Sequence, residues 1–279
     1  MEDTRQYTST ELKQLHTVLY EILEEVVRVC NQLEIPFFMI GGSAIGVYYW
    51  NGIIPWDDDI DIGMTRKDYD NFLREAPKYL RKDFFLQWVD TDPHVPFYFA
   101  KVRKNNTKFV ESAYKSINMH HGLYVDIFPF DKVPDNTFLQ KSQRAFTGFL
   151  NSCFIGKDIW QWKYFGKCEL ETPRKRNPIA CLLTRISVLF FTKIQLYKML
   201  TYAQKFFNKT NASCYNLVTE KRDHIPVEDV ENLQNVKFGS LTVNAPSNIK
   251  RYLKHHYPGL RKYVPKEEQE NHRPSLLSF

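Results

Sequence analysis

Cysteine and glycine are scarce in this 279-residue chain, and it has no long uninterrupted apolar run. Its five cysteines stand far apart, form no Cys-x-x-Cys pair and are odd in number, which excludes a disulfide framework and a zinc knuckle. A reducing cytoplasm fits this usage. No apolar segment typical of a signal peptide opens the chain, and Arg185, Lys193 and Lys198 interrupt the longest apolar stretch, 178–200. We therefore expect a cytoplasmic protein without a membrane-spanning segment.

The remaining composition is that of a globular protein. Apolar residues make up 43% of the chain and aromatic residues 15%, which is enough to build a core and excludes a chain that is disordered for lack of one. Basic side chains outnumber acidic ones by 38 to 32, which leaves a formal charge of +6. This length suggests one large domain or two small ones, at about 150 residues each.

Hydrophobic spacing predicts the elements of the first half. Thr8 and Glu11 form a capping box before apolar residues at helical spacing, so a helix should run to about residue 34. A buried strand is predicted at 37–40 and a helix from Ser43, with the Gly41-Gly42 turn between them. The further elements expected here are a strand-like segment at 53–63, a helix capped by Thr65, and strands at 97–103, 108–112 and 123–128.

The second half of the chain is predicted to contain more helix than the first. The elements expected here are a helix at 136–163, a charged loop at 169–177, a long basic helix at 178–208, a hairpin around 238–240, a helix from Ser247 to His256, and a mobile polar tail after Pro265. The predicted fold class is α/β (α+β), a mixed sheet flanked by helices with a mostly helical addition. Its expected segments are a catalytic core at 1–135, a helical insertion at 136–224, and a C-terminal segment at 225–279 that packs on the core.

The residues that are candidates for a functional site are concentrated in one glycine-rich, acidic stretch. Five of the 11 glycines fall between Gly41 and Gly63, which indicates close backbone approach. The same stretch contains an acidic run, Asp57, Asp58, Asp59 and Asp61, whose charges repel unless a cation or basic groups lie against them. On a strand, Asp59 and Asp61 share one face, about 7 Å apart, while the isoleucines between and after them face the core. Such a carboxylate pair suits a hard divalent cation, above all Mg²⁺.

A third acid and a phosphate seat complete the predicted site. Asp126 stands between β-branched residues of another predicted strand, where it is a third metal ligand, the base for an attacking hydroxyl, or a buried structural acid. The Gly41-Gly42-Ser43 turn at the start of a helix offers backbone N–H groups and a hydroxyl to a phosphate. A metal on one side and an amide cradle on the other is an arrangement for phosphoryl transfer.

These motifs resemble those of the LicD family. The resemblance rests on Gly41-Gly42-Ser43, on the segment from Asn51 to Asp61 that includes Trp56-Asp57-Asp58-Asp59, and on the segment from His121 to Pro129 around Asp126. It runs from about residue 12 to 135 and returns more weakly from about 225 to 272, whereas 136–224 matches nothing recognisable. It implies a nucleotidyltransferase-like fold and transfer of a substituted phosphate, typically phosphocholine from CDP-choline, to a surface glycan; fukutin and its relatives, which use CDP-ribitol, are kin.

The resemblance also assigns roles to individual residues. It makes Asp59 and Asp61 the metal-binding pair and Asp126 the third carboxylate, with Mg²⁺ as cofactor and Mn²⁺ as an alternative. The phosphate-binding turn becomes Gly41, Gly42 and Ser43, where the family usually has Thr in place of Ser43. The chain departs from the family at Tyr49-Trp50, where a basic residue is usual.

Three further residues carry two interpretations each. Lys101 and Arg103 share one strand face and either neutralise the donor diphosphate or form a solvated edge. Trp56 either stacks on the donor base or choline group or is a core aromatic. His120, His121 and His272 show no metal-ligand spacing, which leaves them structural.

We therefore expect a metal-dependent transferase that moves a phospho-alcohol from a CDP-alcohol to a glycan or lipid-linked glycan of the lipopolysaccharide, capsule or teichoic acid type. The alternatives are a glycosyltransferase with an Asp-x-Asp pair and a nucleotide-binding protein without catalysis. No nucleic-acid partner is expected. The basic stretch 178–200 is either a packed helix or a peripheral contact with the inner face of a membrane.

Overall fold

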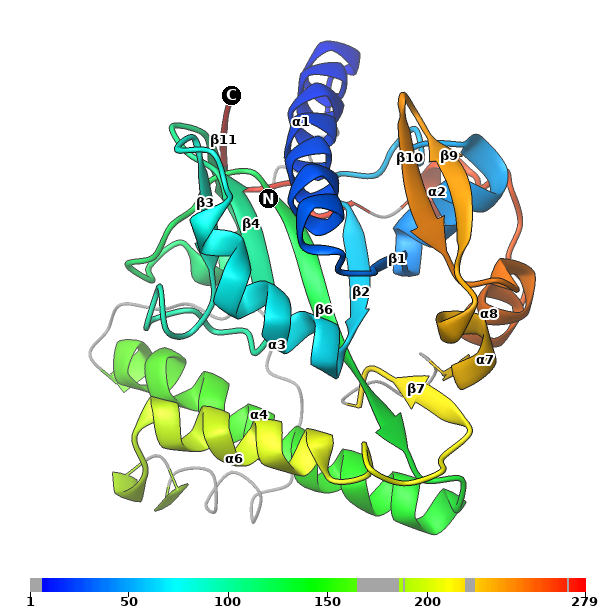
Figure 1. Ribbon diagram of the computed structural model, residues 1–279. Coiled ribbons are helices and arrows are strands. Elements are labelled where there is room, and N and C mark those ends of the chain that lie inside the picture. Colours follow the sequence, from blue (N-terminus) through cyan, green and yellow to red (C-terminus); the bar gives the residue numbers. More distant parts are fainter. Residues whose placement is uncertain (1–6, 165–185, 188, 219–223, 270) are drawn as a thin grey trace.

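The computed structural model describes residues 7–164, 186–187, 189–218, 224–269 and 271–279. At its centre is a seven-stranded sheet with the order β1-β2-β6-β4-β3, and β7 and β8 continue from the end of β6 (Figure 1). In this sheet β2 and β6 run parallel and the other pairs antiparallel. The strands of the sheet are β1 (Phe38–Met39), β2 (Asp61–Thr65), β3 (Phe84–Gln87), β4 (Ala100–Lys104), β6 (Tyr124–Val133), β7 (Cys214–Asn216) and β8 (Ile225–Pro226).

Two small two-stranded sheets and the helices surround this centre. The small sheets pair β9 (Gln234–Phe238) with β10 (Leu241–Ala245) and β5 (Lys108–Val110) with β11 (Leu276–Ser278). The α-helices are α1 (Ser9–Leu33), α2 (Gly41–Trp50), α3 (Arg66–Glu75), α4 (Thr137–Tyr164), α6 (Lys193–Lys205), α7 (Val227–Glu231) and α8 (Ile249–His256), with short 3₁₀ helices at Ala76–Lys78, Ser112–Tyr114 and Lys266–Glu268. This mixed sheet between helices confirms the predicted fold class.

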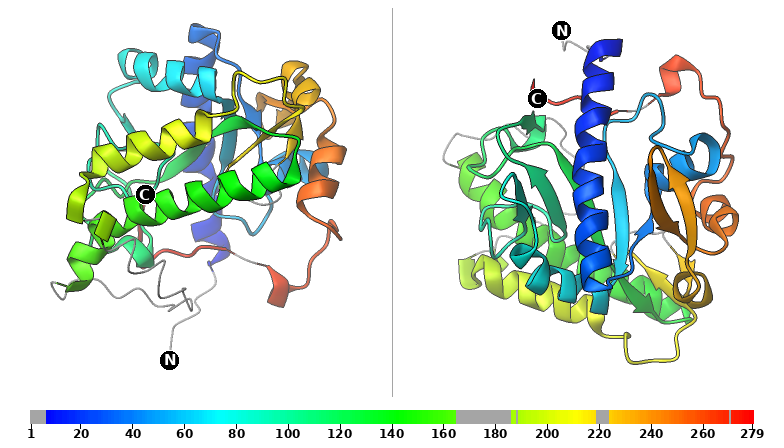
Figure 2. Two further views of the ribbon diagram at one scale, coloured as in Figure 1. Left: turned by 90° about the horizontal axis from the view of Figure 1, so that it is seen from below. Right: turned by 45° about the horizontal axis from the view of Figure 1, so that its top comes forward.

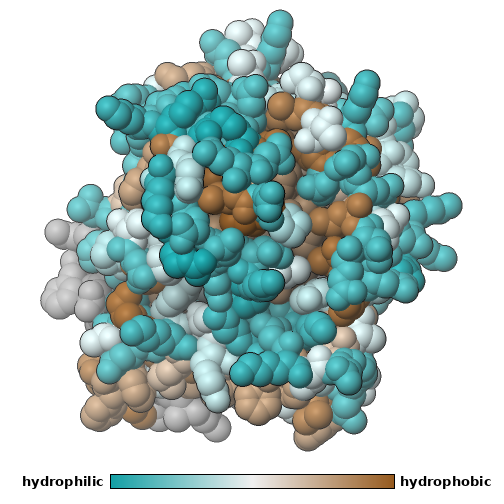
Figure 3. All heavy atoms as spheres, in the orientation of Figure 1, coloured by the Kyte–Doolittle hydropathy of each residue, from teal (hydrophilic) through white to brown (hydrophobic). Residues whose placement is uncertain are grey.

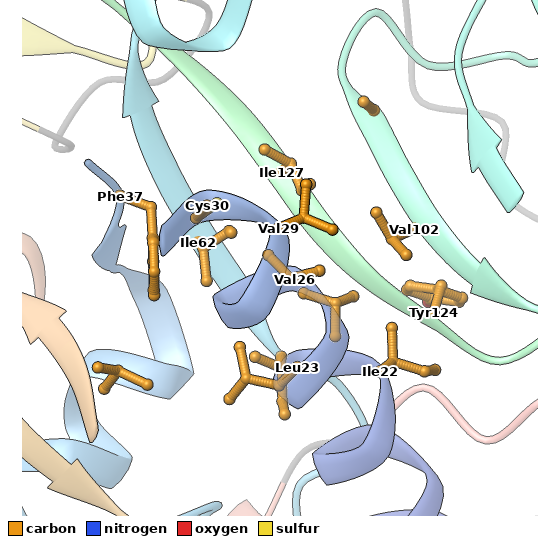
Figure 4. Close-up of a cluster of buried hydrophobic side chains, with 14 of the residues drawn as sticks. Ile22, Leu23, Val26, Val29, Cys30, Phe37, Ile62, Val102, Tyr124 and Ile127 are labelled. Atoms are coloured by element: carbon orange, nitrogen blue, oxygen red, sulfur yellow. The ribbon is translucent and has the colours of Figure 1, made fainter. Parts of the chain in front are cut away.

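Helix α1 covers one face of the sheet. Its N-terminus has the predicted capping box, in which the Thr8 hydroxyl accepts from the Glu11 N–H and the Glu11 carboxylate accepts from the Thr8 N–H. Its apolar stripe, which includes Ile22 and Val26, is buried against strand residues such as Ile62 and Ile127, as Figure 4 shows. Each of these fully buried side chains contributes about 1.5–3 kcal/mol.

Helices α4 and α6 form a layer against the opposite face. They lie side by side as an outer layer when the molecule is seen from below (Figure 2, left). The Gln143 side chain of α4 donates to the carbonyls of Ala203 and Gln204 in α6. Leu150, Phe154, Leu196 and Leu200 pack with sheet residues into a second buried cluster. The face of the sheet opposite α1 is therefore also enclosed, and the candidate site lies on this face.

Several element boundaries differ from the prediction. Helix α2 begins at Gly41 instead of Ser43, and the strand-like segment becomes regular β2 only at Asp61. The predicted helix 178–208 is not continuous: α6 starts at Lys193, capped by the hydroxyl of Thr192, while 178–185 and 188 lie outside the described residues.

The C-terminal region differs as well. Asn248, not Ser247, caps α8, because the Ser247 hydroxyl donates to Asp229 instead. The tail that was expected to be mobile supplies β11, which pairs with β5. Strand β3 was not predicted, whereas the hairpin β9–β10 was.

Candidate active site

Two of the predicted acids lie side by side at the start of the parallel strands. Asp61 opens β2, and its register partner in β6 is Asp126. The backbone N–H of Asp126 donates to the carbonyl of Ile60 at 2.9 Å. Ile60 and Ile62 are completely buried beneath α1, so the alternation of the strand turns Asp61 to the opposite face. The pairing of β2 with β6 thus brings together acids that are 65 positions apart in sequence.

Lys101 extends this row of charges into β4. It is the register partner of Asp126, and its ammonium lies 2.8 Å from Oδ1 and 3.1 Å from Oδ2 of that carboxylate. The ammonium also lies 3.4 Å from the centre of the Tyr124 ring, and Lys101 is almost completely buried. Burial raises the pKa of Asp126, and the ammonium of Lys101 opposes that rise. Lys101 therefore has a carboxylate partner within the site, which excludes the solvated-edge interpretation.

The acidic run packs against these residues and is short of positive charge. Burial and the neighbouring carboxylates raise the pKa of Asp57 to about 8 and that of Asp59 to about 6. The pKa of Asp61 is also raised well above its usual value, by burial first and then by Asp59 and Asp126. Carboxylates that resist ionisation together are the electrostatic sign of a site that binds cations.

The start of α2 packs tightly against the same acids. A Cβ atom on Gly42 would lie 2.7 Å from Oδ2 of Asp57, and one on Gly41 would lie 3.1 Å from Oδ2 of Asp61. Gly41 also has a φ of +54°, in the left-handed region that favours glycine. The Ser43 hydroxyl accepts from the N–H of Asp61 at 2.9 Å, so it positions this acid and keeps its own proton free to donate.

Sequence reasoning missed a set of residues from the two ends of the chain. The carboxylate of Asp58, which is nearly completely buried, accepts from the Tyr7 hydroxyl at 2.7 Å and from the His272 N–H at 2.8 Å. The His272 ring lies 3.7 Å from Asp58 and 3.9 Å from Asp59, and these carboxylates raise its pKa to about 9. Spacing along the chain gave no sign of this contact. His272, which the sequence analysis left as a structural residue, therefore lies at the site.

Arg103 does not have the environment that a diphosphate-binding residue needs. It is completely buried, and its guanidinium donates to the side chain of Gln87 and the carbonyl of Gly122. Burial lowers its pKa. Although Arg103 shares a strand face with Lys101, it lies two positions further along β4, where these groups engage it. The proposed role in neutralising the donor is therefore corrected to a structural one.

Two pockets meet at Asp59 and His272. One, of about 320 Å³, lies between α2 and the C-terminal segment and is lined by Asp57, Asp59, Asp61 and His272, with Gly42, Trp50, Trp56 and Lys262 around them. The other, of about 230 Å³, lies over β4 and β6 and is lined by Asp59, Lys101, Asp126 and His272, with an aromatic wall and residues of α4. The site therefore has room for a ligand on each side of its carboxylates.

Trp56 lies in the first of these pockets. Its ring packs edge-to-face against Trp50 at 6.0 Å, and Trp50 in turn packs against Tyr263. The Lys262 ammonium lies 5.0 Å from the Trp50 ring. Trp56 is half-buried, so it belongs to an aromatic wall at the pocket and is not a residue of the closed core.

The donor set fits a divalent cation. The predicted acids Asp59, Asp61 and Asp126 line the two adjoining pockets, and burial among other carboxylates raises the pKa of Asp59 and Asp61, whereas Asp126 is paired with Lys101. Within the described residues, the group whose ligand atoms all lie within 4.8 Å of one another is Asp58, Asp59 and His272. Asp59 belongs both to the predicted acids and to this group. Carboxylate oxygens such as those of Asp59 are the ligands that Mg²⁺ or Mn²⁺ prefers.

Sheet order and site together define a nucleotidyltransferase-like α/β protein, and comparison with known proteins specifies the family that it resembles. The family model "LicD/FKTN/FKRP, nucleotidyltransferase domain" matches residues 34–164, which include every predicted acid of the site. Over this range, just under half of its length, the chain is similar to the LicD family.

Individual relatives extend this match. The chain is 23% identical to the lipopolysaccharide cholinephosphotransferase LicD of Haemophilus influenzae, over 94% of this chain and 95% of that protein. It is 24% identical to the ribitol-5-phosphate transferase FKTN of Homo sapiens, over 55% of this chain and 29% of that protein. Because the first alignment spans nearly the whole chain, most of 136–224 also has a counterpart in a relative, contrary to the sequence-based expectation.

Proposed function

We propose that this protein transfers a phospho-alcohol from a CDP-alcohol to a hydroxyl of a glycan. The match to the LicD family model and the names of the relatives, a cholinephosphotransferase and ribitol-5-phosphate transferases, support an enzyme that transfers phosphate-containing groups. The observation that carries the proposal is the row Asp61, Asp126 and Lys101 across three neighbouring strands, with two pockets meeting beside it.

The pocket beside α2 suits the donor. Its floor contains Asp59 and Asp61, its wall the aromatic rings of Trp50 and Trp56, and its edge the ammonium of Lys262. An aromatic wall can stack on a cytosine base, and the ammonium can pair with a phosphate. We assign the divalent cation to Asp59 and Asp61; when bound, it supplies positive charge to the diphosphate.

The pocket beside α4 suits the acceptor. A sugar hydroxyl that enters here meets Asp126, which burial makes a stronger base and Lys101 holds in place. The hydroxyl oxygen forms a bond to the phosphorus that carries the alcohol, the bond from this phosphorus to the bridging oxygen breaks, and CMP leaves with that oxygen. Asp126 takes the proton of the hydroxyl.

The free cysteines Cys30, Cys153 and Cys214 agree with a reducing, cytoplasmic setting.

A panel of CDP-alcohols tests this proposal. Purified protein is incubated with CDP-choline, CDP-ribitol or CDP-glycerol, a glycan acceptor and Mg²⁺, and CMP is measured with and without EDTA. We expect acceptor-dependent CMP from at least one donor, and loss of turnover by several orders of magnitude in Asp61→Asn. Asp126→Asn should abolish transfer and retain donor binding in calorimetry.

Each rival function has its own outcome in the same assay. A nucleoside diphosphate with a glycosidic product indicates a glycosyltransferase, and binding without turnover indicates a binding protein. Either result overturns the proposal, as does turnover of Asp61→Asn within about tenfold of wild type at saturating Mg²⁺.

A further inference from the structure

A third hollow lies at the opposite end of the strands that carry the acids. This groove, of about 540 Å³, is formed where β2, β6 and α6 end, and Thr65 and Tyr215 are part of its lining. We call it the basic–aromatic groove and define it by Lys67, Lys132, Tyr202, Lys205, Phe206 and Lys209. Asp61 and Thr65 are the two ends of β2, so the groove lies roughly 13 Å along the strand from the acids, at about 3.3 Å per residue.

The groove has an excess of positive charge. Arg66 is not part of this excess, because its guanidinium is buried against Asp131 at 2.6 Å, and Lys205 is paired with Asp70. Lys67 and Lys209 are exposed and have no acidic partner within 4 Å among the described residues. The sequence itself has no Asp or Glu between Glu171 and Glu220. Helix α6 and the segment after it therefore offer a ligand positive charge only.

Large aromatic side chains project beside these lysines. Tyr202 on α6 and Phe206, the residue that caps its C-terminus, are one helical turn apart and are 72% and 63% exposed. At the neighbouring start of α4, Phe138 is 73% exposed. Figure 3 shows hydrophobic residues at the lower edge of the molecule, where α4 and α6 lie in Figure 1. Exposed aromatic rings among lysines are typical of surfaces that enter the headgroup region of a bilayer.

We propose that the basic–aromatic groove docks the protein on an anionic lipid bilayer. The lysines pair with lipid phosphates and the two rings enter the interface, which leaves the acids facing away from the lipid surface at the other end of β2. This goes beyond the proposed transfer reaction. In the stretch 178–200, Lys193 is ion-paired with Asp158 and nearly buried, so its charge is not available to lipid, while 178–185 and 188 lie outside the described residues.

Vesicle co-sedimentation of the full chain tests the proposal. We expect binding to vesicles with 30% phosphatidylglycerol at low salt, none to pure phosphatidylcholine, and weakening as salt shortens the screening length from roughly 10 Å at 0.1 M to 3 Å at 1 M. Lys67→Glu with Lys209→Glu should weaken binding at least about tenfold, because each basic residue at such a surface favours binding about fivefold. Tyr202→Ser with Phe206→Ser should remove the binding that remains at high salt.

A matched control separates the groove from net charge. Lys13→Glu on α1 with Lys250→Glu on α8 changes the formal charge equally at exposed positions outside the groove, and should leave vesicle binding unchanged. Equal weakening by both pairs, no effect of the groove pair, or no binding at low salt overturns the proposal. Binding of a soluble anionic polysaccharide through the same lysines without vesicle binding also overturns it. The assay contains no donor, so its failure is distinct from failure of the transferase proposal.

Discussion

Replacing one acid of the site should make the metal-free protein more stable. The pKa of Asp59 rises from 3.8 to about 6 on folding, because burial and the Asp58 and Asp126 carboxylates disfavour its charge. An acid with a raised pKa in the folded state binds its proton more tightly there, so the free energy of unfolding falls as pH rises from about 4 to 6. A shift of about two pKa units corresponds to about 3 kcal/mol of lost stability above pH 6.

Asp59→Asn removes this charge and keeps the shape of the side chain. In EDTA, the variant should be more stable than wild type by up to about 3 kcal/mol at pH 8, and nearly equal to it at pH 4. Urea unfolding followed by tryptophan fluorescence measures both values. Asp90→Asn, at an exposed aspartate, serves as the control and should leave the difference between the two pH values unchanged.

Mg²⁺ should reverse the order of stability. A cation that binds only the folded state stabilises wild type at pH 8 by about 4.1 kcal/mol at one thousand times its dissociation constant, which exceeds the deficit of about 3 kcal/mol, and it should stabilise Asp59→Asn much less. The reasoning is refuted if Asp59→Asn is destabilising at pH 8 in EDTA while the Asp90→Asn control behaves as expected. That result would show that the Asp59 charge is already compensated by protein groups such as His272.

Two further predictions concern Lys101 and the glycines. Lys101→Met removes the charge that holds down the pKa of Asp126, so the acidic limb of the pH–rate profile should move to higher pH; an unmoved limb in a folded variant argues against Asp126 as the base. Gly148→Ala in α4 should raise the free energy of unfolding by about 0.5–1 kcal/mol, because its Cβ would meet nothing within 4 Å. Gly46→Ala should lower the free energy of unfolding by about 1–3 kcal/mol, because its Cβ would lie 2.3 Å from the Gly52 carbonyl oxygen. Thermal melts of the pair check the opposite signs.

Local patterns predicted several elements, and the strand face on which Asp61 lies, for physical reasons. The capping box of α1 and the hairpin turn act within a few residues, so spacing alone reveals them. The isoleucines next to Asp61 show which face of the strand is buried. The Gly-Gly-Ser turn and the acidic run then lead to the family, and the pairing of Asp61 with Asp126 follows from its fold.

The features of the site that the sequence could not predict are contacts between residues that lie far apart along the chain. His272 reaches Asp58 only because the C-terminal segment returns along the site to pair β11 with β5. Lys101 and Arg103 look equivalent by alternation, but one meets Asp126 and the other meets Gln87 and a backbone carbonyl. Periodicity identifies the face of a strand and not the partner that a side chain meets there.

The mass gained by the acceptor tests the central claim most directly, since a nucleotidyltransferase-like site can be used to transfer either half of a CDP-alcohol. Purified protein, CDP-choline or the donor that proves active, and a defined glycan are incubated with Mg²⁺, and the product is analysed by mass spectrometry. We predict an acceptor that gains the phospho-alcohol, with one CMP released per product, and loss of both in Asp61→Asn. An acceptor that gains the cytidylyl group, with free phospho-alcohol released, would contradict the account.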